Sequence, residues 1–151
     1  MGGVSLFYQG LEPYWTAEVK YSVYGRRQHI PAMLCAIPDL IAYIYQLLFY
    51  SPDVVIVNPS FRSYQLKRDG LYLLLARWMG KKVVSMFHGW DRAYSQQMEN
   101  RPSCCVRWFN KSTYIYVLCS DFRQALQRMG ITVPILLATT EVSDRLVAHY
   151  D

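Results

Sequence analysis

Short apolar runs that recur along the chain constrain its fold more than any other feature of the sequence. The run Val54–Val57 is preceded by Ser-Pro-Asp and followed by Asn58-Pro59. A short continuous apolar run bounded in this way is typical of a parallel strand buried on both faces. The same pattern predicts strands at 82–87, 114–118 and 133–137, the last with Pro134 near its start, where a missing donor is tolerated. A further strand is predicted over 19–24, closed by Gly25.

Segments between these runs carry apolar residues at helical spacing. The spacing between Leu71 and Trp78 predicts a helix that ends at Gly80. Other helices are predicted over 5–14, over 38–50 with Pro38 in the first turn, and from Ser120 as N-cap to a stop at Gly130. The segment 92–110 is predicted to break at Pro102.

This alternation of strands and helices predicts an α/β fold. The expected architecture is a Rossmann-like, doubly wound domain over residues 1–151, with a mainly parallel sheet flanked by helices. In such sheets, ligands bind beyond the carboxyl ends of the strands. The residues that follow each strand are therefore the first place to look for chemistry.

Composition narrows the classes of protein that the chain can belong to. Hydrophobic residues make up 52% and charged residues 18%, which excludes a disordered chain. The formal charge of +5 favours an anionic partner, but the basic residues are scattered in pairs, and nucleic acid is not expected. The thirteen tyrosines are expected mainly in packing, with a ring platform for a sugar or lipid as the alternative.

Cysteine spacing and the apolar stretches bear on compartment and cofactors. The four cysteines form no C-x-x-C pair, so free thiols in a reducing cytosol are expected, and no structural zinc. No signal peptide is recognised at the start. The most apolar stretch, 34–50, has an uninterrupted part of only about a dozen residues, whereas a membrane span needs roughly 20. A buried helix is predicted there instead.

Candidate site residues follow the predicted strands. His88 comes directly after the second strand, where an imidazole can hydrogen-bond a sugar hydroxyl or exchange a proton near neutral pH. Asp91 can orient that histidine or cap the next helix, and the cap is favoured. Gly2 and Gly3 precede a predicted helix, a position where backbone amides can approach a phosphate. Asn58, Ser60, Trp90 and Asp91 are predicted to line an acceptor crevice.

A hydrolase is the first alternative, because the residues around His88 also look like an oxyanion loop. α/β-Hydrolases place their nucleophile in a G-x-S-x-G turn between a strand and a helix. The corresponding turn here reads Leu118-Cys119-Ser120-Asp121 and carries no glycine. The hydrolase interpretation is therefore disfavoured.

Taken together, these blocks resemble the N-terminal domain of GT-B-fold glycosyltransferases of family 4. The resemblance is carried by Gly2-Gly3-Val4-Ser5 with Tyr8, Gly10 and Leu11, by 53–59, by 68–91, and by 116–122 with Leu126 and Gly130. It implies that the chain is the acceptor-side half of an enzyme that transfers sugar from a nucleotide-sugar donor to a glycan or lipid-linked acceptor, retaining anomeric configuration and needing no metal. It implies that His88 lies near the transferred sugar and that Gly2 and Gly3 face the donor diphosphate.

Two departures from the family shape what is expected of the chain. The family's first strand, before the glycine loop, is not expected in the given sequence: either its start is placed late, or it is a fragment, or the fold manages without that strand. The C-terminal donor-binding domain is likewise not expected within residues 1–151. A donor domain supplied in cis or in trans is therefore expected, with little activity from this chain alone. The alternative is a non-catalytic binding or assembly module that complements a separate donor-domain chain. A cytoplasmic location is expected, together with peripheral contact at the inner face of the membrane. A role in polysaccharide biosynthesis is also expected.

Overall fold

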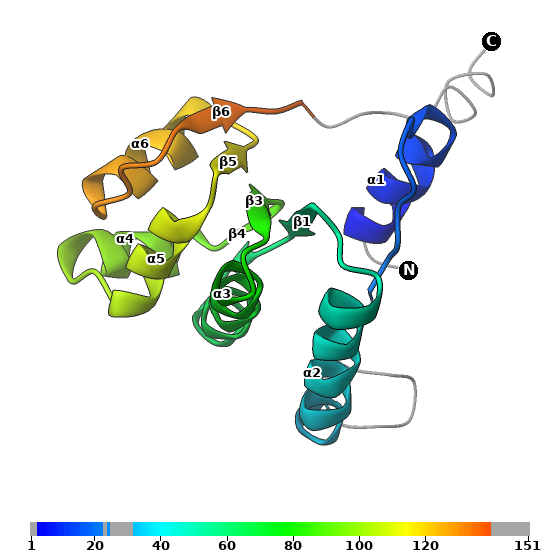
Figure 1. Cartoon of the computed structure of the whole chain (residues 1–151). Helices are drawn as coiled ribbons and strands as arrows, with labels where there is room; N and C mark the ends of the chain where they lie inside the picture. Colours follow the sequence, from blue (N-terminus) through cyan, green and yellow to red (C-terminus); the bar gives the residue numbers. More distant parts are fainter. Residues whose placement is uncertain (1–2, 23, 25–31, 140–151) are drawn as a thin grey trace, which may run out of the picture.

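The computed structural model, which describes residues 3–22, 24 and 32–139, confirms the α/β fold. Its main sheet has four strands, β1 (Val54–Val57), β3 (Lys82–Phe87), β5 (Tyr114–Val117) and β6 (Ile135–Leu137). All neighbouring strands are parallel, in the order β1-β3-β5-β6 (Figure 1). The four strongest apolar runs of the sequence are therefore the four strands of the sheet.

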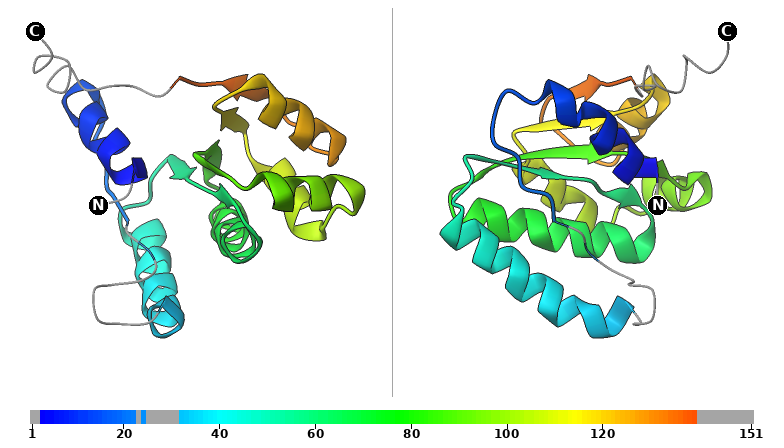
Figure 2. Two further views of the ribbon diagram at one scale, coloured as in Figure 1. Left: turned by 180° about the vertical axis from the view of Figure 1, so that it is seen from behind. Right: turned by 90° about the vertical axis from the view of Figure 1, so that its right-hand side faces the viewer.

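Helices cover both faces of this sheet, as the Rossmann-like pattern requires (Figure 2). One face carries α1 (Gly3–Leu11), and the other carries α2 (Ala32–Phe49), α3 (Ser63–Trp78), α5 (Cys104–Trp108) and α6 (Ser120–Arg128). The remaining helices are α4 (Arg92–Asn100) and the short 3-10 turns η1 (Glu12–Tyr14) and η2 (Phe109–Lys111). The break between α4 and α5 falls at Pro102, as predicted.

The core lies between β3, β5 and the helix α3. Fully buried apolar side chains from each layer meet there, including Leu73, Val83, Phe109, Ile115 and Leu126. The two helix ends predicted from glycine are confirmed, since Gly80 has a φ of 77° and Gly130 a φ of 90°. Only glycine adopts such angles without strain, so these residues end α3 and α6.

Two local predictions, the strand over 19–24 and the N-cap at Ser120, were wrong. Residues 19–22 form no strand, because their side chains bond to neighbouring coil and helices instead: Trp15 Nε1 donates to Tyr21 Oη at 2.8 Å, and the Lys20 ammonium lies 4.9 Å from the Tyr50 ring centroid. Val23 and Gly25 lie outside the described residues. The N-cap of α6 is Cys119 rather than Ser120, and its side chain makes no capping bond.

Helix α2 begins six residues before the predicted start and runs through Pro38. A proline inside a helix removes one amide donor, which leaves the carbonyl of Leu34 without its helical partner. Leu34 and Pro38 are both exposed, so water can satisfy that carbonyl and the helix continues. The helix is also only partly buried, although a buried helix was predicted: one side packs inward and the other is open.

The outer edge of β1 is bare. Among the described residues no strand pairs with it, and its Val54 and Ile56 side chains are exposed. Figure 1 shows α1 and α2 beyond that edge, on opposite sides of the sheet plane. An unpaired strand edge with apolar side chains is a surface on which another segment or chain can pair.

A second, two-stranded parallel sheet extends the first beyond its carboxyl end. It pairs β2 (Ser60–Phe61) with β4 (Gly89–Trp90), and sequence patterns did not predict it. Val57 pairs with Ser85, 28 residues later, whereas Ser60 pairs with Gly89, 29 residues later. The β3–β4 side therefore holds one extra residue across the break, and His88 lies in that break.

None of the helices in the described part of the chain is both long and apolar enough to cross a bilayer.

The close contact between β2 and β4 gives the first prediction. A Cβ placed on Gly89 would lie 2.7 Å from Ser60 Oγ and 3.0 Å from Ser60 Cβ, so Gly89→Ala is expected to lower the free energy of unfolding by about 1–3 kcal/mol. Gly10→Ala is the matched control, because nothing lies within 4 Å of its added Cβ, and the change should be neutral or raise stability by up to about 1 kcal/mol. Urea unfolding measures both, and equal midpoints for the two variants would contradict the packing described here.

Candidate functional site

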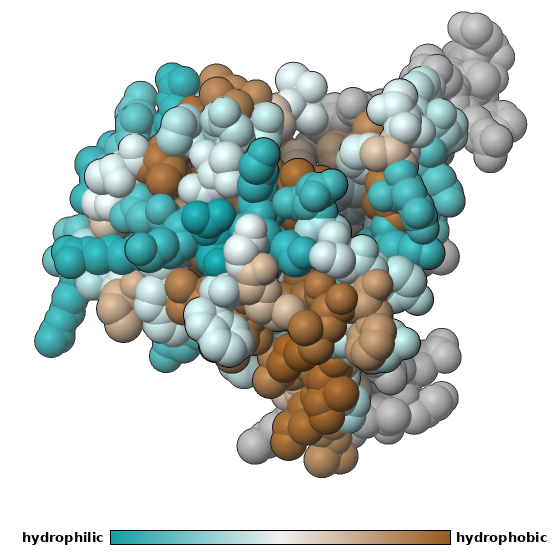
Figure 3. Space-filling model, in the orientation of Figure 1, coloured by the Kyte–Doolittle hydropathy of each residue, from teal (hydrophilic) through white to brown (hydrophobic). Residues whose placement is uncertain are grey.

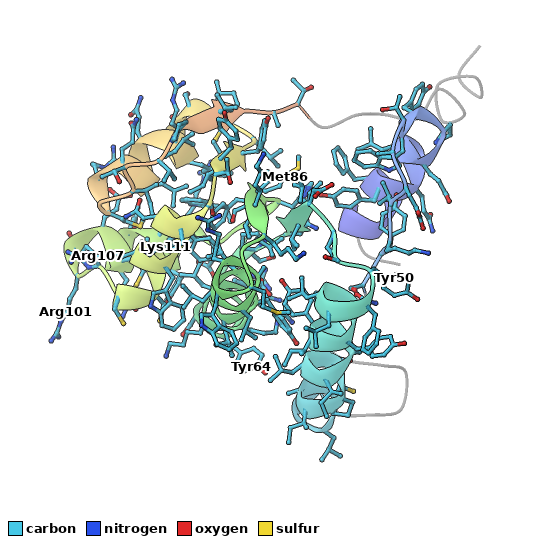
Figure 4. The ribbon with its side chains drawn as sticks, viewed as in Figure 1. Tyr50, Tyr64, Met86, Arg101, Arg107 and Lys111 are labelled. Atoms are coloured by element: carbon cyan, nitrogen blue, oxygen red, sulfur yellow. The ribbon has the colours of Figure 1, made fainter. Side chains whose placement is uncertain are left out.

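Two polar residues lie where the main sheet breaks into the smaller one. Asn58 follows β1 and His88 follows β3, so both stand at the carboxyl ends of neighbouring parallel strands. The helix α1 approaches the same edge, and its Tyr8 contacts both strand ends. Met86, labelled in Figure 4, lies at this end of β3, and its Sδ is 4.0 Å from Tyr8 Oη. Segments about 50 and 80 residues apart in sequence therefore meet at one place.

A hydrogen bond ties α1 to the strand end. Tyr8 Oη donates to Asn58 Oδ1 at 2.7 Å. Burial raises the pKa of the Tyr8 phenol to about 12, against the smaller opposing effect of the bond to Asn58. Tyr8 therefore stays protonated at neutral pH and acts as a donor, which fixes the orientation of the Asn58 carboxamide.

His88 lies against the aromatic side chains of α1. Its ring centroid is 5.0 Å from that of Phe7 and 6.1 Å from that of Tyr8, both in edge-on geometry. Its Nε2 is buried and has no hydrogen-bond partner, although buried polar atoms are normally paired. Burial lowers the pKa of the imidazole below its usual value, so the ring is neutral at pH 7. A neutral imidazole at a strand end can hydrogen-bond a ligand hydroxyl once the packing over its buried Nε2 opens.

The two predicted diphosphate-binding glycines are placed differently by the structure. Gly2 lies outside the described residues, and Gly3 is the first residue of α1. Gly3 precedes Phe7 by one helical turn, about 6 Å along the axis, so the N-terminus of α1 lies near His88. The first turn of a helix has free amides and a positive dipole end, which suit a phosphate.

The other predicted acceptor residues lie on β2, on β4 and at the start of α4. Ser60 packs directly against Gly89, the neighbour of His88. Asp91 is the N-cap of α4 and accepts from the Tyr94 backbone amide at 3.0 Å, which confirms the favoured capping role. Trp90 stacks between Phe61 and Phe122, with ring centroids 4.3 Å and 4.2 Å away. Both faces of the indole are occupied, so Trp90 can offer only an edge to a ligand.

Sequence reasoning did not single out Phe7 and Tyr8 as site residues. Tyr8 entered only as part of the family resemblance, and Phe7 was not named. The signal that could have found them is their place on the first helix, one turn after the glycines, in a fold whose first helix borders the ligand edge.

Among the described residues no group of three or more His, Cys, Asp or Glu side chains could hold a metal ion.

The fold and this site define the chain as a Rossmann-like α/β domain with a polar and aromatic cluster at the carboxyl edge of its sheet. Comparisons with protein-family models, with curated proteins and with solved structures found no match to the chain. Its function is therefore argued from the site itself.

The burial of His88 gives a prediction about its titration. With only three histidines in the chain, proton NMR can follow each imidazole, and His88 should titrate below the usual value of about 6.5. Because the unfolded state binds this proton more readily, stability should fall as pH drops through the interval between the unfolded and folded pKa values. Phe7→Ala should expose the ring and raise its pKa toward 6.5. A His88 that titrates at 6.5 or above in the unaltered chain would contradict the buried geometry.

The stacking of Trp90 predicts that this side chain stabilises the fold, unlike a tryptophan exposed on the surface. Trp90→Ala removes the middle ring of a three-ring stack and should cost about 3–5 kcal/mol of unfolding free energy. Trp78→Ala is the control, since that indole is 85% exposed and its loss should change stability by less than about 0.5 kcal/mol. Thermal or urea unfolding compares them, and a small loss for Trp90→Ala would mean that the stack does not support the site.

Proposed function

We propose that this chain is the acceptor-side half of a glycosyltransferase, which transfers sugar from a nucleotide-sugar donor to a glycan or lipid-linked acceptor with retention of configuration. The observation that carries the proposal is the neutral His88, with its buried and unpaired Nε2, beside the N-terminal helix at the carboxyl edge of a parallel sheet. The family resemblance of the sequence supports it independently, because the resemblance assigns the same histidine to the region of the transferred sugar.

The contacts of the cluster suggest a role for each residue. His88 hydrogen-bonds a hydroxyl of the sugar or acceptor, and the Asn58 carboxamide, oriented by Tyr8, supplies a second polar contact. The amides at the start of α1, at Gly3, face the donor diphosphate when a donor domain is present. Rate enhancement in this scheme comes from positioning and from stabilising the leaving diphosphate, without a metal. In this proposal the chain works in the cytoplasm.

A non-catalytic assembly module is the second candidate function. The wide exposed apolar side of α2 favours it, because a module whose role is to hold a partner needs such a surface. The two functions differ in what happens on mixing: a half-enzyme becomes active when it meets its donor domain, whereas a scaffold binds without adding a residue to the reaction.

Calorimetry with UDP, GDP and their sugars tests the proposal, using the purified chain alone and mixed with a candidate donor-domain chain. Little nucleotide binding by the chain alone, followed by turnover on mixing, is the expected result. Tight binding of nucleotide by the chain alone would overturn the division of labour and make it an independent nucleotide-binding domain. Assembly on mixing without turnover would favour the non-catalytic module.

His88→Ala tests the proposed catalytic support. In the chain combined with its donor domain, kcat should fall by about 100-fold or more, because a positioned polar group at the reacting sugar is lost. The free energy of unfolding should change by less than about 1 kcal/mol, since the imidazole Nε2 makes no hydrogen bond within the protein. His29→Ala and His149→Ala are the matched controls, and both should retain turnover. Unchanged kcat in His88→Ala would remove this residue from the mechanism.

A further inference from the structure

Helix α2 is apolar on two different sides. Its inner side carries Cys35, Tyr43 and Leu47, which are buried against the rest of the domain. Its outer side carries five apolar residues that are each 52–69% exposed, and we call them the α2 stripe: Leu34, Ile37, Ile41, Tyr45 and Leu48. A helix that is apolar all round is normally buried on all sides. The outer side of α2 therefore lacks the covering that its composition requires.

The stripe forms one continuous surface on the outside of the molecule. Figure 3 shows a hydrophobic band over α2, at the margin of the domain farthest from α6. Phe49 and Tyr50 continue the band at the end of the helix, and both are more than half exposed. Figure 4 labels Tyr50 at this end of the helix, where the Lys20 ammonium lies 4.9 Å from its ring centroid. The band includes none of the residues clustered around His88, so its role is separate from the chemistry proposed for that cluster.

The size of this surface matches one side of a stable interface. Taking roughly 150–250 Å² for a large side chain, the seven exposed residues present on the order of 800 Å². The largest apolar patch of a typical monomer is about 300–600 Å². A standard protein–protein interface buries about 800 Å² on each partner. The exposed side of α2 is thus larger than a monomer normally tolerates and sufficient for a dimer.

The order of residues in the stripe is symmetric about its centre. The steps from Leu34 to Leu48 are 3, 4, 4 and 3 residues, with Ile41 in the middle and leucine at both ends. The mean step of 3.5 is the spacing of residues that pack two helices along a shared seam. If a second copy of the helix lies antiparallel across a two-fold axis, each Leu34 meets a Leu48 and Ile41 meets itself. Antiparallel packing also brings opposite ends of the helix dipoles together.

Charge favours a second copy over a lipid surface. Between residues 34 and 50 the only charged residue is Asp39, which is buried on the inner side. Two stripes can therefore meet without like charges facing each other. Helices that lie on membranes carry Lys and Arg along their polar side, and α2 has none within its bounds.

We propose that the α2 stripe is a homodimer interface, in which the α2 helices of two copies pack antiparallel about a two-fold axis at Ile41. Each copy covers the outer side of the other's α2, and the two candidate sites remain separate. Because each chain carries a net charge of +5, salt screens the repulsion between copies, and dimerisation should strengthen as ionic strength rises. Attachment to an anionic membrane would weaken under the same change.

Sedimentation equilibrium of the full chain at low and high salt tests the proposal. The unaltered chain should be a dimer, and Ile41→Lys, which places two ammonium groups at the axis, should weaken dimerisation at least about 100-fold. Leu137→Lys is the control, since Leu137 is 50% exposed on β6 and should leave the dimer intact. Circular dichroism checks that each variant is folded. A monomer at tens of micromolar in the unaltered chain, or a dimer that survives Ile41→Lys, overturns the proposal.

A cysteine at the axis provides a second, independent measurement. Ile41→Cys, made with the exposed Cys104 replaced by serine, should give a covalent dimer on mild oxidation, because the two thiols face each other. Leu34→Cys in the same background should not, because its antiparallel neighbour is Leu48. Efficient cross-linking through Leu34→Cys would overturn the antiparallel arrangement. Binding of a monomeric chain to vesicles of anionic phospholipid, with no dimer, would assign the stripe to a lipid surface instead.

Discussion

The parallel pairing of β3 with both β1 and β5 is the constraint on which the rest of the structure depends. β3 is the only described strand with six residues, and its alternate residues Val83, Ser85 and Phe87 are fully buried. Parallel strands need crossover connections, and because the strands follow one another in order across the sheet, the right-handed crossovers place α3 and α6 on the same face. The same pairing brings Asn58 and His88 to one edge, so the candidate site follows from the topology of the sheet.

Sequence patterns could predict most of this framework. The four apolar runs stand out because strands of a parallel sheet are rich in apolar residues. The expectation that they are buried on both faces was wrong, since burial alternates along β3 and β5 and the edge residues Val54, Ile56 and Leu137 are exposed. Helix ends at Gly80 and Gly130 were predictable because few other residues adopt their φ angles. The position of His88 at the carboxyl edge of the sheet was predictable, because the residue that follows a parallel strand lies there.

What the sequence could not predict depends on contacts between distant segments. The pairing of β2 with β4 involves two residues on each strand and a close approach of Ser60 to Gly89, which no local pattern records. Residues 19–22 instead make side-chain contacts with Trp15, just after η1, and with Tyr50, just after α2. Helix α2 passes Pro38 because the carbonyl that loses its partner lies on an exposed side. Tyr8 joins the site only once α1 has docked onto the strand ends.

The central claim is that ligands bind where α1 meets the ends of β1 and β3. Heteronuclear NMR of the chain titrated with an alkyl glycoside, as a mimic of the acceptor, tests this most directly. The account predicts shifts concentrated in the His88 imidazole, the Asn58 carboxamide and the amides of α1, and little change on the outer side of α2. Shifts confined to other parts of the domain, or none at millimolar glycoside, would contradict it.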